Sequence, residues 1–342
     1  MKLTAEQLAE VARHYGVSVD TSLPPQKGYR NVSYAFEHRH HSTWYNFIVY
    51  KSEPAMYERI QRTNMLGEAL QAAEVPARCV ADDRIMLLWN GNVGAYGSLY
   101  YYLRGETIAW EAYTMKHIKL LGWVLADVHA AFRTVDKTGF PTVVDEYNAI
   151  LKRMASYFSR PTIQHASHMK LNLRLDTSTL DYLQGFLQAC RTLPDQQILH
   201  MDMVRGNVLF EPAHKSSRYA IQTVACSGVL DFEKAAVGHV LFDLARSLAF
   251  LLVDCSRKSE RQIRSYFLHS GYAKRGGAKI KATSVTSQNG TNYDVLEAAT
   301  NLFLMYDFYK FLRDNPYESL AQNYHFVRTR NILLAKNLLH YI

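Results

Sequence analysis

Two short segments of the sequence combine residue types that phosphoryl transfer requires. Residues 198–210 read Ile-Leu-His-Met-Asp-Met-Val-Arg-Gly-Asn-Val-Leu-Phe, so Asn207 follows Asp202 by five positions at the start of an apolar strand. The reaction needs a carboxylate that orients the attacking hydroxyl and accepts its proton, and a nearby carbonyl oxygen that helps to hold Mg²⁺. Asp202 and Asn207 are suited to these two tasks.

A second carboxylate follows another apolar strand. Residues 228–233 read Gly-Val-Leu-Asp-Phe-Glu, which places Asp231 at the end of that strand. A divalent cation bound to phosphates usually takes only one or two protein carboxylates. Taken singly, Asp202 and Asp231 could be ordinary turn residues. Both together, each at the edge of an apolar strand, favour a catalytic site.

The elements that must position these residues fall into two groups. Strand-like patterns dominate the first third, at residues 31–37, 44–51, 77–80, 84–89 and 98–103, beside helices at 4–15 and 54–73. Helical patterns dominate the remainder, at residues 114–132, 144–158, 178–191, 241–254, 260–268, 293–313 and 324–341, with short strands at 208–210 and 222–230. The pattern predicts an α+β fold with a β-rich N-terminal lobe, residues 1–102, and a mainly helical C-terminal lobe, residues 103–342.

Composition excludes several function classes. The 342 residues are 48% hydrophobic and 20% charged, which is typical of a globular protein. The net charge of +8 is spread along the chain without a recognition motif, so we expect no nucleic-acid partner. The cysteines form no Cys-x-x-Cys pair, and no Gly-x₄-Gly-Lys-Ser/Thr loop occurs. Without a signal-peptide pattern or a long apolar run, we expect a cytoplasmic protein with no membrane partner, as a monomer or homodimer.

Other conspicuous residues have simpler explanations. The histidines at 38–41, His165 and His168 are interpreted as solvent-facing, because no second cluster of metal ligands accompanies them. Gly91, Gly94 and Gly97 are predicted to form a flexible connector, and residues 276–292 a mobile surface loop. The aromatic run at 303–311 could line a substrate site, but core packing of a helix explains it better.

The two catalytic segments resemble motifs of the aminoglycoside phosphotransferase and choline kinase superfamily, including its homoserine-kinase-like branch. His-x-Asp-(x)₄-Asn followed by apolar-Asp-Phe-Glu is highly specific in combination. Weaker similarities extend over nearly the whole chain, at residues 27–34 (phosphate hairpin), 48–51 (third strand), 100–108 (hinge), 121–129 (a helix ending in a histidine) and 238–245 (a brace after the metal site). The resemblance implies a protein-kinase-like two-lobe fold and an enzyme that transfers the γ-phosphoryl of ATP.

The resemblance also implies a role for individual residues. Asp202 would be the catalytic base, Asn207 and Asp231 the magnesium ligands, and His200 a residue that holds the catalytic loop through hydrogen bonds. The nucleotide would contact Gly28, Asn31, Lys51, Tyr101, Tyr102 and Leu103, with Lys51 on the α- and β-phosphates. Glu58 is named as the glutamate that pairs with Lys51. Compared with the spacing typical of the family, Glu58 comes early in the sequence and Glu68 comes late. ATP and Mg²⁺ are the implied cofactors, and a small hydroxylated molecule is the acceptor.

Departures from protein kinases narrow the substrate class. The nucleotide loop is not Gly-x-Gly-x-x-Gly, the metal motif reads Asp-Phe-Glu, and eleven residues separate Asp231 from Asp243. That span is too short for a long activation segment, which favours a small acceptor such as an amino alcohol, a sugar or an antibiotic-like molecule. Two alternatives remain: a catalytically weak, kinase-like nucleotide-binding regulatory protein, and an atypical protein kinase.

Overall fold

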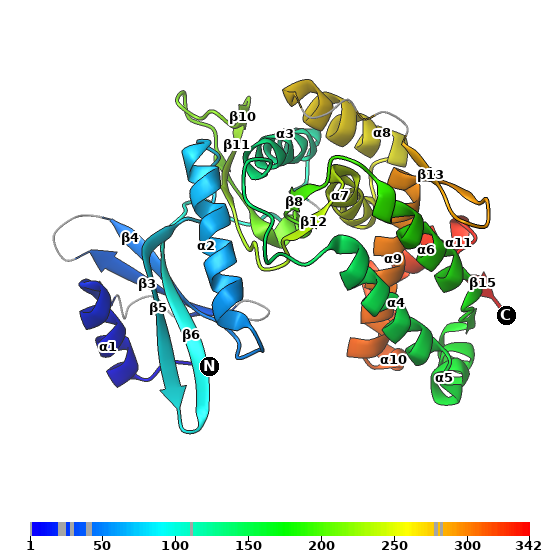
Figure 1. The fold of residues 1–342 in the computed structure, drawn as a ribbon, viewed down its shortest axis with the longest axis horizontal. Coiled ribbons are helices and arrows are strands. Elements are labelled where there is room, and N and C mark those ends of the chain that lie inside the picture. Colours follow the sequence, from blue (N-terminus) through cyan, green and yellow to red (C-terminus); the bar gives the residue numbers. More distant parts are fainter. Residues whose placement is uncertain are drawn as a thin grey trace.

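The chain folds into a β-sheet part and a helical part (Figure 1). They are joined by the end of the last sheet strand and the residues that follow it, 101–105, which are called the connecting strand below. The computed structural model describes residues 2–19, 25–27, 31–38, 43–109, 112–276, 280 and 283–342. Gly28 lies outside these described residues. None of the helices formed by these described residues is both long enough and apolar enough to cross a membrane.

An antiparallel sheet forms the N-terminal part. Its strands are β1 (Val17–Val19), β2 (Gln26–Lys27), β3 (Val32–His38), β4 (Trp44–Val49), β5 (Val80–Asn90) and β6 (Val93–Tyr101). Their order is β1-β3-β4-β6-β5, with β2 beside β3. The interpretation of residues 77–80 and 84–89 as two strands was wrong, because β5 runs through Asp82 as one strand with irregular register there.

One helix packs on each face of this sheet. Helix α1 (Ala5–Tyr15) begins at Thr4, whose side chain forms a capping box with Gln7. It contributes Val11 to a cluster with Phe36 and Phe47 on one face. Helix α2 (Met56–Ala72) covers the other face, where its Ile60 belongs to a cluster with Tyr100. The face under α2 is the one that looks toward the helical part.

The glycine-rich stretch before the connecting strand is not a flexible connector. Gly94 and Gly97 lie inside β6, and only a tight turn at residues 91–92 separates this strand from β5. A Cβ on Gly97 would lie 2.2 Å from the ring of Phe47 on the neighbouring strand. The glycine therefore makes room for an aromatic ring on the sheet surface.

The helical part follows from residue 103. Its helices are α3 (Met115–Phe132), α4 (Val143–Phe158), α5 (Pro161–Leu171), α6 (Ser178–Ala189), α7 (Val240–Asp254), α8 (Glu260–Arg264), α9 (Val295–Asp314), α10 (Tyr317–Leu320) and α11 (Tyr324–Ala335), with a π-helical segment (Ser265–Tyr272) after α8 and 3₁₀ turns at Cys190–Thr192, Arg205–Asn207 and Ala273–Arg275. Short strands complete it: β7 (Leu173–Arg174), β8 (Gln197–Leu199), β9 (Val208–Pro212), β10 (Ala220–Ile221), β11 (Val224–Val229), β12 (Ala236–Gly238), β13 (Ser284–Thr286), β14 (Asn292–Asp294) and β15 (His340–Tyr341).

Three sequence interpretations need correction here. Helix α5 was missed, and it carries His165 and His168. The predicted helix at 324–341 ends at Ala335, because the last residues pair with β7 as β15. Of the predicted loop at 276–292, the described residues from Ser284 onward include the hairpin of β13 and β14.

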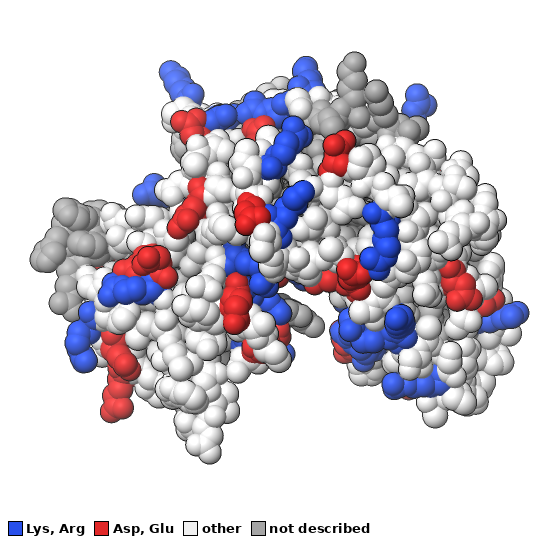
Figure 2. All heavy atoms as spheres, in the orientation of Figure 1, with Lys and Arg blue, Asp and Glu red and all other residues white. Residues whose placement is uncertain are grey.

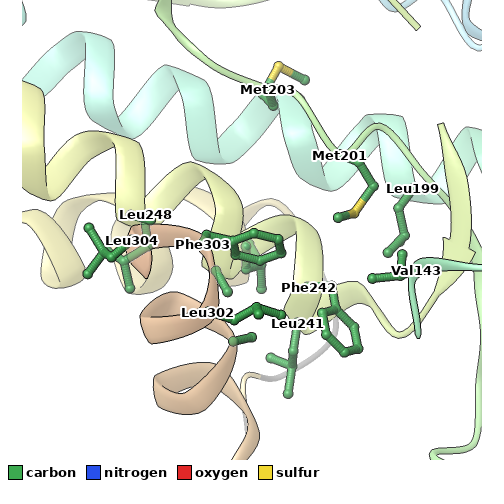
Figure 3. Packing of buried hydrophobic residues seen from close by; sticks show 14 of the residues in the cluster. Val143, Leu199, Met201, Met203, Leu241, Phe242, Leu248, Leu302, Phe303 and Leu304 are labelled. Carbon is green, nitrogen blue, oxygen red and sulfur yellow. The ribbon is translucent and has the colours of Figure 1, made fainter. Parts of the chain in front are cut away.

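The core of the helical part lies directly beneath the catalytic segment. Figure 3 shows Leu199, Met201 and Met203 beside side chains of α7 and α9, among them Phe242 and Phe303. All five side chains are buried. The aromatic run of α9 therefore belongs largely to the core, as the sequence favoured.

Backbone hydrogen bonds join the two parts beyond the connecting strand. Val229 at the end of β11 accepts from the N–H of Arg78 at 2.8 Å, and its own N–H donates to Pro76 O at 2.8 Å. Within the helical part, directly after the connecting strand, Glu106 and Phe210 exchange both of their backbone hydrogen bonds, each at 2.9 Å. The segment before β5 is thereby attached to the strand that leads to Asp231.

Helix α3 depends on a close backbone approach at Gly122. A Cβ there would lie 2.3 Å from the carbonyl oxygen of Phe267 and 2.7 Å from the amide nitrogen of Tyr272. Both neighbours are backbone atoms, so a side chain at this position must push the π-helical segment away.

We predict that Gly122→Ala lowers the free energy of unfolding by about 2 kcal/mol or more, because overpacking outweighs the helix propensity gained. Urea denaturation measures the change. The exposed Ala130 on the same helix provides the control, since Ala130→Gly should cost only about 1 kcal/mol. A Gly122→Ala protein at least as stable as wild type would contradict the close packing.

Candidate active site

The catalytic segment is a tight loop between two buried strands. β8 leads into it, a 3₁₀ turn at Arg205–Asn207 closes it, and β9 leaves it. Within the loop, Asp202 O accepts from the N–H of Val204 at 2.7 Å, and Val204 O accepts from the N–H of Asn207 at 2.9 Å. These bonds fold the five-residue spacing so that the side chains of Asp202 and Asn207 meet.

The side chains of Asp202 and Asn207 are in direct contact. Asn207 Nδ2 donates to the backbone oxygen of Asp202 at 2.9 Å and to its Oδ2 at 3.1 Å. The amide group is thus oriented by its nitrogen, and its Oδ1 remains available as a ligand. Asn207 O also accepts from the N–H of Leu230 at 2.8 Å, which brings the residue next to Asp231 against the loop.

Two cations flank the Asp202 carboxylate. Lys234 Nζ lies 2.7 Å from its Oδ2, and Arg246 Nη2 lies 4.0 Å from its Oδ1. Burial raises the pKa of Asp202, but the charges of Lys234 and Arg246 outweigh burial and hold this pKa below its ordinary value. The carboxylate is therefore ionised at neutral pH and can accept a hydrogen bond from a hydroxyl group.

His200 holds the loop, as the resemblance implied. Its Nδ1 accepts from the N–H of Asp202 at 3.2 Å, so the ring proton is on Nε2, which donates to Leu230 O at 3.1 Å. The ring thereby connects the segment that carries Asp202 with the one that carries Asp231.

Asp243 fixes the same loop from below. Its buried carboxylate accepts from the N–H of His200 at 2.7 Å, from the N–H of Met201 at 2.8 Å and from His129 Nε2 at 3.0 Å. Met201 has a φ of 61°, a left-handed conformation that costs free energy in a residue with a side chain. The bond to Asp243 and the burial of the Met201 side chain offset this cost.

The metal motif is tied to the N-terminal sheet. Asp231 has a φ of 60° and its Oδ1 accepts from the N–H of Glu233 at 3.3 Å. Asn31 Nδ2 donates to Glu233 Oε1 at 2.6 Å, while Asn31 Oδ1 accepts from the N–H of Lys51 at 3.2 Å. Burial and the charge of Asp231 raise the pKa of Glu233. Asn31, a residue of the phosphate hairpin, therefore connects the backbone of Lys51 with the metal motif.

Lys51, which the resemblance places on the phosphates, follows β4 with an exposed side chain. Its side chain is 63% exposed, and its Nζ lies 3.8 Å from Glu53. Glu58 is exposed in the first turn of α2, and Glu68 is exposed as well. Among the described residues, the glutamate that pairs with Lys51 is Glu53, and neither Glu58 nor Glu68 forms an ion pair with it.

The connecting strand presents the residues predicted to face the adenine. The N–H of Tyr101 donates to Cys79 O, and the N–H of Tyr102 donates to Trp44 O, both at 3.1 Å. Both tyrosines are exposed, and Leu103 is half-buried beside Gly228. A cavity of about 520 Å³ adjoins this strand, lined by Gln71, Pro76, Tyr101, Leu103, Arg218 and Tyr219 among others. Its lining does not include Asp202, Asn207 or Asp231.

Several charged residues of the site were missed from the sequence. Arg246 Nη1 donates to Asp307 Oδ2 at 2.6 Å, and Lys310 Nζ lies 2.9 Å from Asp307 Oδ1. Burial raises the pKa of Asp307, but Arg246 and Lys310 lower it further than burial raises it. Arg246 lies three residues after Asp243 on α7, so only the shared helix face hinted at it. Asp307 and Lys310 carried no local signal.

The described residues contain no group of three or more His, Cys, Asp and Glu side chains that could hold a metal ion. A site made of Asn207 and Asp231 would have only two protein ligands, fewer than such a group, and both would offer the oxygen atoms that Mg²⁺ prefers. Figure 2 shows a notch between the sheet part and the helical part, with charged side chains of both signs at its inner end.

Comparison with known proteins agrees with this geometry. The model of the phosphotransferase enzyme family matches residues 22–279, which are 258 of the 342 residues. Among solved structures, an amicoumacin kinase in complex with AMP-PNP, Ca²⁺ and Ami has a TM-score of 0.66 at 13% identity, covering 97% of this chain and 94% of that chain. A microcompartment-associated aminopropanol kinase has a TM-score of 0.66 at 15% identity, covering 97% and 98%.

A GDP complex of wild-type aminoglycoside 2'-phosphotransferase-IIIa is similar at a TM-score of 0.57 and 16% identity, covering 97% of this chain and 100% of that chain. No curated protein matches the sequence significantly. The solved structures confirm the predicted protein-kinase-like fold.

Asp243→Asn should reduce the stability of the protein at neutral pH. Burial raises the pKa of Asp243, but the hydrogen bond and charge of His129 lower it more, so the folded-state pKa is below the ordinary value. Its contribution is therefore complete above the unfolded-state pKa and is lost as the pH falls below about 4. We expect a deficit of about 3 kcal/mol at pH 7 that shrinks at pH 3.5.

Urea unfolding of both proteins at the two pH values measures this deficit. Asp314→Asn is the control, because that carboxylate is partly exposed beside Arg313 and should contribute at most about 1 kcal/mol. Equal deficits for the two variants at pH 7 would refute the role of Asp243.

Proposed function

This chain belongs to the phosphotransferase enzyme family, and on that premise we propose that it transfers the γ-phosphoryl of ATP, with magnesium, to a hydroxyl group of a small molecule. One observation carries the proposal: the ionised Asp202 carboxylate contacts Asn207, whose backbone bonds to Leu230, the neighbour of Asp231. A base and two oxygen ligands for a cation are thus adjacent.

Asp202 would orient the acceptor hydroxyl and take its proton. As the new bond forms between the acceptor oxygen and the γ-phosphorus, the bond to the oxygen bridging the β- and γ-phosphates breaks, and that oxygen leaves with ADP. Asn207 Oδ1 and Asp231 would hold Mg²⁺, which would neutralise charge on the phosphates. Lys234 would place a further positive charge beside the transferred group, since its Nζ already lies 2.7 Å from Asp202.

We propose that residues 1–102 form the nucleotide-binding lobe and residues 103–342 the lobe that holds the acceptor. Asn31, Tyr101, Tyr102 and Leu103 lie along the boundary between these lobes, as a nucleotide between them would require. The same location for the phosphate hairpin at Gly28 rests on the sequence resemblance alone.

The acceptor side of Asp202 has mixed charge. Arg246, Asp307 and Lys310 together carry one negative and two positive charges next to the catalytic carboxylate. A polycationic antibiotic needs a more acidic pocket than this. Kinases of amicoumacin and of aminopropanol share the fold, which supports a small hydroxylated acceptor.

Substitution of the two aspartates should separate chemistry from binding. Asp202→Asn should reduce turnover by about 10²–10⁴-fold with little change in ATP affinity, because a positioned base contributes that much. Asp231→Asn should weaken magnesium-dependent ATP binding as well as turnover, since this carboxylate would hold the cation that bridges the phosphates. Calorimetric titration with and without Mg²⁺, beside a rate assay over a panel of hydroxylated acceptors, tests both.

Asp181→Asn, on the exposed face of α6, serves as the control and should match wild type. Loss of nucleotide binding in Asp202→Asn with intact binding in Asp231→Asn would reverse the two roles. Unchanged turnover in both variants would refute the proposed activity.

The segment after Asp231 should need no phosphorylation. Residues 236–238 form β12, which pairs with β8 directly before the catalytic loop, so this span is already ordered by a strand partner. Protein produced without any protein kinase should therefore be fully active in the same rate assay. A requirement for phosphate on residues 232–242, detected by mass spectrometry, would contradict this prediction.

A further inference from the structure

The face of β4 that looks toward α2 and the helical part carries a tyrosine where a phosphate-binding lysine is expected. Successive residues of a strand point to opposite faces. Ile48 and Tyr50 belong to the cluster with Tyr100 on the α2 face, and the N–H of Tyr50 continues the strand pairing to Tyr96 O at 2.8 Å. Lys51 follows Tyr50 directly, and its exposed ammonium pairs with Glu53.

A different cation occupies the buried space beside Tyr50. Arg78 is 8% exposed, and its guanidinium carbon lies 5.0 Å from the centre of the Tyr100 ring. The hydroxyls of Tyr50 and Tyr100 pair with each other at 2.6 Å, and Tyr100 donates to Asn64 at 2.9 Å. Neither hydroxyl accepts a hydrogen bond from Nε or Nη2 of Arg78.

Two nitrogens of this guanidinium lack a partner. Nε and Nη2 of Arg78 are buried and form no hydrogen bond within the part of the chain that the structure describes. Leaving donors of a buried charged group unpaired costs several kcal/mol. A ligand that brings anionic oxygens to these nitrogens would remove that cost.

The surroundings of Arg78 are those of the metal motif. Burial lowers the pKa of Arg78, but Tyr50, Tyr100 and the carboxylates of Asp231 and Glu233 raise it more, so its pKa is above the ordinary value. These carboxylates are close enough to act on it electrostatically. The guanidinium of Arg78 is therefore within electrostatic range of the carboxylates proposed to hold the cation.

The backbone of Arg78 is fixed on two sides. Its N–H donates to Val229 O at 2.8 Å, two residues before Asp231. Helix α2 approaches its carbonyl so closely that a Cβ on Gly67 would lie 2.4 Å from Arg78 O. Arg78 is thus held at a constant position relative to the metal motif.

From the unpaired Nε and Nη2 and the backbone bond to Val229, we propose that Arg78, rather than Lys51, is the cation that binds the α- and β-phosphates of the nucleotide. Its planar guanidinium can present Nε and Nη2 in parallel to two phosphate oxygens, a geometry that an ammonium group cannot reproduce. The inference rests on the proposed function, because it names the residue that recognises the nucleotide in that same site.

Binding of adenosine, ADP and ATP with Mg²⁺ to Arg78→Met, Arg78→Lys and Lys51→Met tests the assignment by calorimetry. Arg78→Met should bind ADP and ATP about 10-fold more weakly or worse, with adenosine affinity unchanged, since adenosine lacks the phosphates. Arg78→Lys keeps the charge without the fork and should lose less. Lys51→Met should show a smaller loss than Arg78→Met. The exposed Arg13 of α1 provides the charge control, as Arg13→Met.

Each result decides the assignment. Removing an unpaired buried cation should leave the melting temperature of Arg78→Met equal to that of wild type or higher. If Arg78→Met nevertheless fails to fold, Arg78→Lys must still weaken the binding of ADP and leave the binding of adenosine unchanged. Equal loss of adenosine and ADP affinity would assign Arg78 a structural role and overturn the inference. A greater loss in Lys51→Met would also overturn it. If wild type binds no nucleotide, the proposed function fails together with the role of Arg78.

Discussion

The buried carboxylate of Asp243 is the interaction on which the rest of the site depends. It collects three hydrogen bonds, from the backbone of His200 and Met201 and from the ring of His129. Because α3 supplies His129 and α7 supplies Asp243, the loop is held by two helices that pack independently of it. This group, together with the burial of the Met201 side chain, stabilises the left-handed conformation of Met201 and thereby the direction of Asp202.

A second constraint follows from the distribution of charge around Asp202. The carboxylate is buried, yet Lys234 and Arg246 keep it ionised. Asp307 in turn pairs with both Arg246 and Lys310. Such a network orients the carboxylate but leaves it a weak base in the resting protein. Proton acceptance then belongs late in the reaction, when the acceptor oxygen is already bonding to phosphorus, which agrees with a positioning role in phosphoryl transfer.

The sequence predicted the family, the two-lobe fold and the phosphotransferase class, and the family match together with the similar structures confirms these. Local spacing was sufficient for the catalytic loop, because Asp202 and Asn207 meet within one turn of chain. It could not decide the direction of the Lys51 side chain, because a shift of one residue along a strand moves a side chain to the other face. Arg78 and Asp307 come from distant segments, so only the folded chain brings Arg78 to Val229 and Asp307 to Arg246. Strands β12 and β15 were missed because distant partners define them.

The hydrogen bonds between residues 76–78 and Val229, and between Glu106 and Phe210, have a mechanical consequence. The two bonds from residues 76–78 to Val229 cross between the lobes, so a rotation about the connecting strand would break both of them. The two bonds between Glu106 and Phe210 lie within the helical lobe and hold its first residues beside β9. The axis of a rotation that opens the cleft must therefore pass close to the bonds between residues 76–78 and Val229. Residues 76–78 would then move with the helical lobe, while the sheet of β1 to β6 would rotate over them as one unit. Arg78, the proposed phosphate ligand, would then keep its position relative to the helical lobe while a nucleotide enters or leaves.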